Sequence, residues 1–464
     1  MPDMYADFKE QPGDDPDDVL FNTLYGVRTI QLNRPKKYNA LNGSMIRKII
    51  PRLKEYQKSA LASIIIIGGA GPKAFCAGGD VSQLAKDIAE NGETGQATSK
   101  SYFGLEYKLD HLIATYPKPY IAYLDGITMG GGVGLSVHAP IRIATENTNF
   151  AMPETGIGFF PDVGGSFFLP RLEGFLGTYL ALTSESLKGV QALYAGVATH
   201  YIDSSVLSNL TARLAELVFK DYDNLHTRLR IIDRTIEEFN TGLPHNEPPH
   251  LAGNLRLAID YCFHYDTVEQ IVSALEKERD SPKSPSQIKE WAKKTLEKLG
   301  EKSPTSLKVT LRQMRLGARW NTAEAFNREY HIAAKFMRHP DFVNGVSARL
   351  IHKPATKARW EPDTLEGVSN DDVENFFRID EGEESLDLLT HGLDYDRNPF
   401  ERDLGLPREE HVEEVVKAKA LGRRRIIETM VEAKEGKIGV KEQVEEVLGR
   451  RAGIDGEGKV VWKS

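Results

Sequence analysis

Cysteine is scarce in this chain, with only Cys76 and Cys262 among 464 residues. Two cysteines cannot form a disulfide framework, and their number favours a reducing compartment. The sequence also has no CxxC or HExxH pattern, so it predicts no metal site. Cys76 lies inside a glycine-rich segment, where we interpret it as a small buried residue beside Ala77 rather than as a catalytic thiol.

Long apolar runs and an excess of positive charge are missing too. The longest isoleucine run, residues 64–67, has the length of a strand and is far short of the roughly 20 residues of a membrane span, so no membrane partner is expected. The formal net charge of −8 gives no general nucleic-acid signature and leaves only local basic patches. Residues 1–20 are acidic and predict a solvated tail. They lack the Arg- and Ser-rich composition of an organelle presequence.

Glycine is plentiful, and one glycine-rich stretch suggests chemistry. The apolar run 120–124 predicts a buried strand, and residues 126–135 then contain three consecutive glycines. Glycines allow backbone N–H groups to approach a ligand, and a helix that begins there favours developing negative charge. Glu154 and Asp162 follow, each after a proline. Together these residues suit acyl transfer, although the residues alone equally permit a tight packing turn with ordinary loop acids.

Further motifs resolve that choice through a resemblance. Four segments stand in order at family-like spacing: Leu32-Asn-Arg-Pro35, Asn39-Ala-Leu41, Ala74-Phe-Cys-Ala-Gly-Gly-Asp80 and Met129-Gly-Gly-Gly132. They resemble the crotonase (enoyl-CoA hydratase/isomerase) superfamily. The resemblance implies an α/β fold, a crotonase-type spiral of ββα repeats with a helical C-terminal region and an appended helical extension.

A finer resemblance points to the 3-hydroxyisobutyryl-CoA hydrolase branch. It is carried by segments 125–138, 150–155, 159–165, 168–172 and 302–308. It implies hydrolysis of a 3-hydroxyacyl-CoA thioester, with the CoA thioester as substrate and no cofactor. The implied catalytic residues are Glu154 and Asp162, with Asp162 on the 3-hydroxyl. Glu106 has an orienting role, Gly79 and Gly131 are the oxyanion donors, and backbone around Ala77 meets the nucleotide end of CoA.

The nearest enzymatic alternative is a hydratase or isomerase. Family hydratases carry a second catalytic glutamate two residues after the triple glycine, and this chain has Gly134 there. Losing one acid/base partner typically costs two or more orders of magnitude in rate, so hydrolysis is favoured.

We divide the chain into an acidic tail (1–20), a crotonase-like core with the active site (21–204), a helical part (205–380) and a linker with a helical extension (381–464). Residues 45–58 predict a helix that Pro51 kinks or breaks, and the polar residues 86–101 predict a flexible loop over the site. In the extension, residues 408–431 and 440–451 predict two polar helices.

The extension raises an alternative of another class. Fungal relatives of this hydrolase branch, some with long C-terminal extensions, occur in the small subunit of the mitochondrial ribosome. The resemblance thus implies a mitochondrial matrix protein and a ribosomal partner, either rRNA or ribosomal protein. The compact basic patch of residues 423–425 suits phosphates and would bind that partner. The alternative without a partner is that the extension packs back onto the enzyme.

Overall fold

The computed structural model describes residues 8–379, 382–390 and 392–463. Its main sheet has the strand order β1-β2-β3-β5-β7-β10. The strands are β1 (Val19–Leu24), β2 (Val27–Leu32), β3 (Ile64–Gly69), β5 (Tyr120–Leu124), β7 (Ile141–Ala144) and β10 (His200–Tyr201). Only β1 and β2 pair antiparallel; the rest run parallel. Parallel strands are covered on both faces, which explains the continuous apolar runs at β3 and β5.

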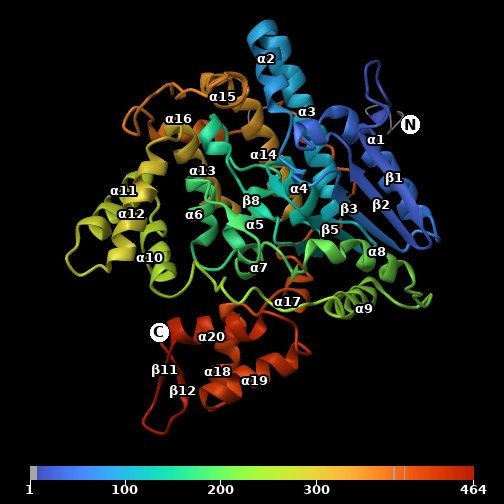
Figure 1. Ribbon diagram of the computed structural model, residues 1–464. Helices are drawn as coiled ribbons and strands as arrows, with labels where there is room; N and C mark the ends of the chain where they lie inside the picture. Colours follow the sequence, from blue (N-terminus) through green and yellow to red (C-terminus); the bar gives the residue numbers. More distant parts are fainter. Residues whose placement is uncertain (1–7, 380–381, 391, 464) are drawn as a thin grey trace.

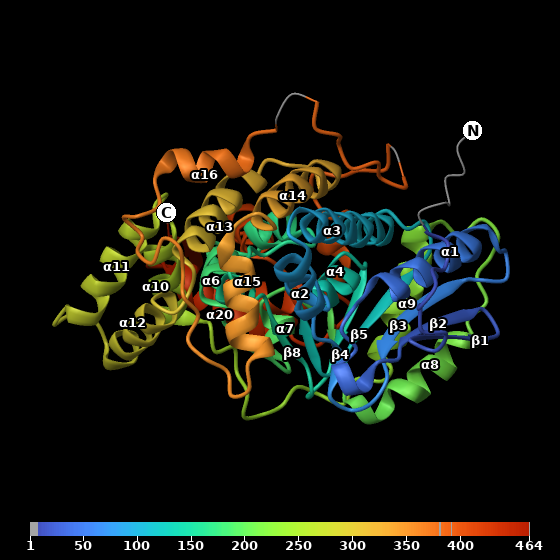
Figure 2. The same ribbon diagram turned by 90° about the horizontal axis from the view of Figure 1, so that it is seen from above.

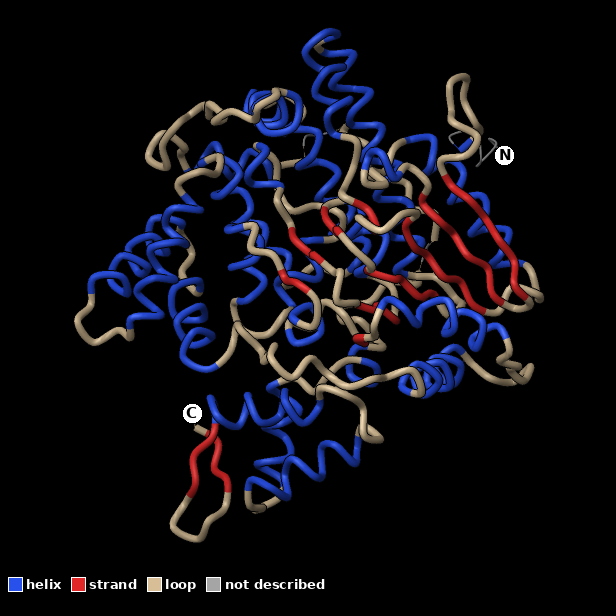
Figure 3. The backbone as a smooth tube through the Cα atoms, viewed as in Figure 1, coloured by secondary structure: helices blue, strands red, loops and turns tan. Residues whose placement is uncertain are grey.

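A second, smaller sheet completes the repeating unit. Its strands are β4 (Ala74–Cys76), β6 (Ile127–Met129), β8 (Asn149–Ala151) and β9 (Leu187–Lys188). In the chain, β4 follows β3, β6 follows β5 and β8 follows β7, and a helix comes after each pair. The two sets of strands lie at the centre and right of the molecule in Figure 3. The expected spiral of ββα repeats is therefore confirmed.

Residues 86–101 are helical, so the prediction of a flexible loop was wrong. They belong to α2 (Val81–Asn91) and α3 (Glu93–Ala114), which pack against each other. Gly92, with φ of +54°, turns the chain between them. A Cβ at Gly95 would lie only 2.1 Å from the Asp87 carbonyl oxygen. The glycines that suggested flexibility instead permit a tight reversal between two helices.

The first helix, α1 (Gly43–Lys58), continues through Pro51, so the proline does not break it. Asn42 caps its start by accepting a hydrogen bond from Met45 N at 2.9 Å. Met45, Ile46, Ile49, Ile50 and Leu53 are fully buried on its inner face. Tertiary burial of an apolar face supplies most of a helix's stability, which offsets the missing proline N–H.

The chain before β1 is more ordered than a solvated tail. Residues 1–7 lie outside the described part, but Phe8 is buried. Asp14 pairs with Arg47, and Asp18 lies 2.6 Å from Lys48 Nζ. Both cations belong to α1, so the acidic segment is held against that helix.

Helices dominate the rest of the body. They include α4 (Gly131–Val137), α5 (Gly165–Phe168), α6 (Leu176–Thr183), α7 (Gln191–Tyr194), α8 (Leu207–Ala215), α9 (Leu225–Glu237), α10 (Gly253–Phe263), α11 (Val268–Asp280), α12 (Ser286–Leu299), α13 (Pro304–Gly317), α14 (Thr322–Phe336), α15 (Pro340–Val346) and α16 (Asn370–Phe377). Viewed from above, α14 runs beside α3, and α3 in turn packs against α4 (Figure 2). No helix of the described residues is long and apolar enough to cross a membrane.

The extension forms a small helical layer beneath the body (Figure 1). It contains α17 (Glu401–Leu404), α18 (Glu409–Ala418), α19 (Arg423–Ala433), α20 (Val440–Arg451) and a hairpin of β11 (Ala452–Ile454) and β12 (Val460–Trp462). The single helix predicted over 408–431 is in fact two, because the chain is extended at Lys419 and at Gly422, the residue that precedes α19. The hairpin was not predicted.

Apolar and ionic contacts fasten this layer to the body. Val412, Ile426 and Val444 are fully buried and join the main core cluster. Lys437 Nζ donates to His200 Nε2 at 2.8 Å and to Asp233 Oδ1 at 2.6 Å, both in the body. The extension therefore packs back onto the body of the molecule, in agreement with the packing alternative stated from the sequence.

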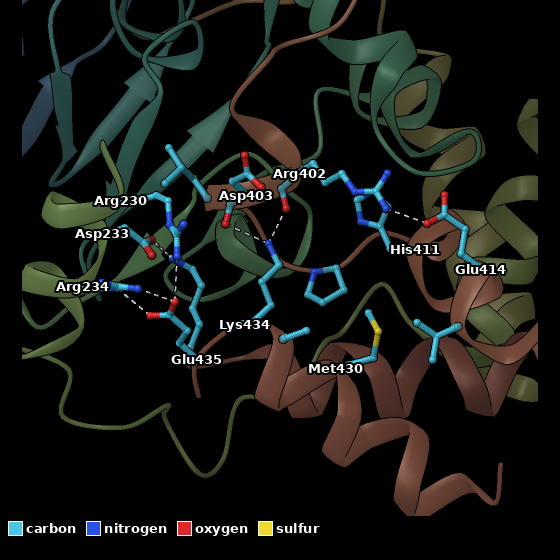
Figure 4. Close-up of a pocket in the computed structure, with 15 residues that line it drawn as sticks. Arg230, Asp233, Arg234, Arg402, Asp403, His411, Glu414, Met430, Lys434 and Glu435 are labelled. Atoms are coloured by element: carbon cyan, nitrogen blue, oxygen red, sulfur yellow. Dashed lines mark hydrogen bonds and ion pairs between the residues drawn. The ribbon is translucent and has the colours of Figure 1, made fainter. Parts of the chain in front are cut away.

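A cavity of about 420 Å³ lies along this seam (Figure 4). Its charged groups are already paired: Arg234 with Glu435 at 2.7 Å, and Arg402 with Glu414 at 2.7 Å. Lys434 Nζ donates to three backbone carbonyls at the end of α17. Removing the extension would leave Arg234 and Asp233 of the body without Glu435 and Lys437, so truncation does not test a partner-binding role cleanly.

Candidate active site

A second cavity, of about 520 Å³, brings together all six residues expected at the site: Ala77, Gly79, Glu106, Gly131, Glu154 and Asp162. They come from widely separated segments. The turn after β4 supplies Ala77 and Gly79, α3 supplies Glu106, and Gly131 is the first residue of α4. Their roles stay predictions; the structure places all six on the wall of one cavity.

Carboxyl side chains and a neighbouring backbone segment approach the glycines at the N-terminal end of α4 closely. A Cβ at Gly131 would lie 2.3 Å from Glu106 Oε1 and 3.3 Å from Gly79 N. A Cβ at Gly130 would lie 3.2 Å from Glu154 Oε1. A side chain at position 131 would therefore have to displace the Glu106 carboxyl. The backbone nitrogen of Gly79 lies beside Gly131 at one point of the cavity wall.

Three carboxyl groups face this point from buried positions. Glu106, Glu154 and Asp162 are each at most 4% exposed. Tyr107 Oη donates to Asp162 Oδ2 at 2.7 Å. Among the described residues, Glu106 Oε1 and Glu154 Oε2 have no hydrogen-bond partner. A buried carboxyl oxygen without a partner is costly, so these atoms are available for a ligand.

Burial changes how these acids ionise. It raises the pKa of Glu106 and of Glu154 well above the usual range, and the charge of Asp162 adds to both shifts. Burial also raises the pKa of Asp162 to about 7, opposed by the hydrogen bond from Tyr107. Acids whose pKa is raised by burial in a cleft suit proton transfer.

Glu154 is placed by a short turn after β8. It begins a 3-10 helix, Glu154–Ile157, and Phe159 N donates to its carbonyl at 3.0 Å. Gly158 closes the turn with φ of +72°, and a Cβ there would lie 2.1 Å from the Asp341 carbonyl oxygen. Glu154 is thus presented by backbone that is fixed on both sides.

Sequence analysis gave no role to Lys302, which is a cation in the same cavity. Its Nζ donates to Ser184 Oγ at 2.8 Å. Burial lowers the pKa of Lys302 to about 8, and its charge lowers the pKa of Glu154. The available signal was its place at the head of segment 302–308, directly before the start of α13, where Ser303 Oγ accepts from Ser306 N.

Comparison with known proteins identifies the family. The family model for enoyl-CoA hydratase/isomerase matches residues 27–377. This chain belongs to the enoyl-CoA hydratase/isomerase family. A solved family structure, a carnitinyl-CoA dehydratase from Mycobacterium thermoresistibile, is similar with a TM-score of 0.68 and 32% identity, covering 79% of this chain and 98% of that one.

Two curated relatives carry different names. A Neurospora crassa protein named small ribosomal subunit protein mS47 is 54% identical over 98% of this chain and 90% of its own length. A Danio rerio protein named 3-hydroxyisobutyryl-CoA hydrolase, mitochondrial, is 44% identical over 78% of this chain and 89% of its own length. The family model ends at residue 377, so the N. crassa match also takes in the extension.

Within this enoyl-CoA hydratase/isomerase fold, position 134 has no room for a second glutamate. A Cβ at Gly134 would lie 2.5 Å from Asp110 Oδ2, and Asp110 is fully buried. Asp110 lies one turn after Glu106 on α3, and neither of its carboxyl oxygens has a partner among the described residues. Asp110 was not anticipated from the sequence, because only packing places it against Gly134.

Cys76 is confirmed as a buried residue. Burial raises the pKa of its thiol to about 12, and Sγ lies 3.6 Å from the Gly78 carbonyl oxygen. Such a thiol is unreactive at neutral pH. Across residues 8–379, 382–390 and 392–463, no cluster of three His, Cys, Asp or Glu side chains is arranged to hold a metal.

The fit between Gly134 and Asp110 can be tested by stability. Gly134→Ala should destabilise the fold by about 1–3 kcal/mol, because the new methyl group overlaps a buried carboxyl. Asp110→Ala in the same chain should recover part of that loss, since it removes the overlapping atoms. Urea unfolding measures both. Gly456→Ala is the control, as a Cβ there meets nothing within 4 Å. Additive losses in the double variant would contradict the contact.

Proposed function

We propose that this protein hydrolyses a 3-hydroxyacyl-CoA thioester, with 3-hydroxyisobutyryl-CoA as its substrate and valine catabolism as its setting. The observation that carries the proposal is the meeting of Glu154, Glu106 and Asp162 with the backbone N–H groups of Gly79 and Gly131 in one buried cavity. The similarity to the Danio rerio hydrolase supports the choice of substrate.

In this reaction Glu154 starts the attack on the thioester carbonyl carbon. It adds its own free oxygen or takes a proton from a water molecule that adds instead. A carbon–oxygen bond forms, and the carbonyl oxygen becomes an oxyanion. Gly79 and Gly131 N–H groups stabilise that charge, each donor typically worth about 3 kcal/mol. The carbon–sulfur bond then breaks, and the CoA thiolate leaves and takes up a proton. If an acyl-Glu154 intermediate forms, water hydrolyses it.

The other cavity residues orient the substrate. Asp162 accepts a hydrogen bond from the 3-hydroxyl group while Tyr107 holds its second oxygen. Glu106 orients the attacking group, and backbone around Ala77 binds the nucleotide end of CoA. The ammonium group of Lys302 favours the ionised form of Glu154. These steps use the CoA thioester as substrate and call for no cofactor.

The role of Glu154 is tested by Glu154→Gln. The variant keeps the shape of the side chain but removes the base and nucleophile, so CoA release from 3-hydroxyisobutyryl-CoA should fall by at least about 100-fold. Release is followed with a thiol reagent under saturating substrate. Gln443→Glu, an exchange of the same pair of side-chain types in the extension, should leave the rate unchanged. Full activity of Glu154→Gln would reject the assignment.

A second role, in the small subunit of the mitochondrial ribosome, is favoured by one observation. The N. crassa relative named mS47 matches this chain across the extension, and a Schizosaccharomyces pombe relative of the same name is 40% identical over 78% of this chain. We propose that the protein works in the mitochondrial matrix and binds that subunit through the outer face of the extension. Enzyme and ribosomal roles use different surfaces and do not conflict.

The basic residues of α19 lie on that outer face. Arg423, Arg424 and Arg425 are exposed, with the Arg424 side chain 93% accessible. Glu428 pairs with Arg424 at 2.8 Å and with Arg425 at 3.3 Å. These surface pairs contribute little and exchange readily with other anions. An RNA phosphate or an acidic protein surface can therefore take the place of Glu428.

Docking is tested by reversing the charge of all three arginines to glutamate. Co-sedimentation with the small subunit in native extract should be lost, and co-sedimentation of the unaltered protein should weaken as salt rises. Lys277, Lys283 and Lys293 changed to glutamate provide the control, since they are exposed on or beside α11 and α12 and carry the same change of charge. Thioesterase activity should survive in both variants. Unchanged co-sedimentation of the arginine variant would defeat this docking surface.

A further inference from the structure

Asp162 stands on a turn with an unusual backbone. The next residue, Val163, has φ of +53° and is fully buried, and Gly164 follows with φ of +82°. Positive φ is rare for a β-branched residue and costs of order 1–3 kcal/mol. Such a conformation persists only where the surroundings enforce it, so something must hold this turn in place.

Three buried side chains hold the backbone on both sides of Asp162. Gln313 Nε2 donates to the Pro161 carbonyl at 2.8 Å, and His138 Nε2 lies 2.8 Å from the Val163 carbonyl oxygen. Glu329 makes the largest set of bonds. Its Oε2 accepts from Gly164 N at 2.7 Å, and its Oε1 accepts from Ser166 N at 2.8 Å and from Ser166 Oγ at 2.5 Å.

Burying the Glu329 carboxyl costs free energy unless it is hydrogen-bonded. It is fully inaccessible, and burial raises its pKa against the opposing effect of its three donors. A buried carboxyl without a cation is retained where its hydrogen bonds fix a particular arrangement. Here all three donors belong to the turn that follows Asp162, so the arrangement that Glu329 fixes is that turn.

The two helices beside the turn contact different parts of it. Tyr107 of α3 binds the Asp162 carboxyl, whereas Glu329 of α14 binds the backbone that follows it. These helices run side by side (Figure 2). The Asp162 side chain is thereby oriented from its tip by one helix and from its base by the other.

We propose that Glu329 is a positioning residue that sets the preference of this site for substrates with a 3-hydroxyl group, by holding Asp162 on its strained turn. The inference rests on the proposed hydrolase function and adds a residue to it. Glu329 touches no substrate atom. Its effect reaches the substrate only through the aim of Asp162, and a displacement of about 1 Å at an orienting group is enough to cost 100-fold in rate.

This role differs measurably from a purely structural one. A residue that merely stabilises the fold would change the hydrolysis of all acyl-CoA substrates alike. A residue that aims Asp162 would harm the 3-hydroxyacyl substrate and spare its analogue without the hydroxyl, because a site built to bond a hydroxyl loses selectivity when that bond is lost.

The test compares kcat/KM for 3-hydroxyisobutyryl-CoA and isobutyryl-CoA in full-length protein. Glu329→Gln keeps the size of the side chain but turns an amide NH₂ toward an N–H donor, so the turn should relax. The preference for the hydroxylated substrate should fall at least about tenfold, as in Asp162→Ala. The double variant should show no further loss, since both changes remove the same interaction.

Asp260→Asn is the matched control, because the Asp260 carboxyl also accepts a backbone N–H, from Phe175 at 2.9 Å. The substrate preference of this variant should match that of the wild type.

Two further measurements keep the outcome decisive. Ser166→Ala removes one donor to Glu329 at little risk to folding and should lower the preference about threefold, roughly half of the full effect on a logarithmic scale. A crystal structure of Glu329→Gln should show Val163 with negative φ and the Tyr107–Asp162 bond lengthened or lost. Equal losses on both substrates, multiplicative losses in the double variant, or an unchanged turn would overturn the inference. If the wild type hydrolyses neither ester, the proposed function fails, and the crystal structure alone decides whether Glu329 positions Asp162.

Discussion

The contact between two acidic residues of α3 and two glycines of α4 is the constraint on which the site depends. Glu106 lies against Gly131, and Asp110 lies against Gly134 one turn further along. The fit allows α4 to begin at the cavity wall with its first N–H beside that of Gly79. It also excludes a side chain at position 134, which removes the place for a second hydratase glutamate. The first contact thus bears on the proposed oxyanion donors, and the second on the proposed choice of hydrolysis over hydration.

Concentrating carboxyl groups in this way has an electrostatic cost. Glu106, Asp110, Glu154, Asp162 and Glu329 are all buried, and each has a raised pKa because of burial. The fold opposes the cost with Tyr107 on Asp162, with Lys302 near Glu154, and with three donors on Glu329. Glu106 Oε1, Glu154 Oε2 and both carboxyl oxygens of Asp110 have no partner among the described residues, and of these three acids Glu106 and Glu154 line the cavity. Two of the unpartnered carboxyl groups therefore lie where a substrate would bind in the proposed reaction.

Much of the fold was predictable because its signals are local. The isoleucines of β3 and the apolar run of β5 indicated buried strands, and Ser303-Pro304 marked the start of α13. The six candidate site residues followed from motifs and meet in one cavity. Predictions failed where packing overrides composition. Residues 86–101 look polar and flexible yet form two helices joined at Gly92, and Pro51 lies within an unbroken α1. Asp110, Lys302 and Glu329 were missed because each owes its importance to a neighbour more than 20 residues away in the chain.

The central claim is that this site cleaves a thioester and does not hydrate a double bond. The most direct measurement compares two reactions of the purified wild type: thiol release from 3-hydroxyisobutyryl-CoA and the loss of enoyl absorbance from crotonyl-CoA. With Glu154 present and no acid at position 134, thiol release should exceed hydration by about two orders of magnitude or more. Rapid hydration of crotonyl-CoA without release of CoA from the hydroxyacyl ester would contradict the account.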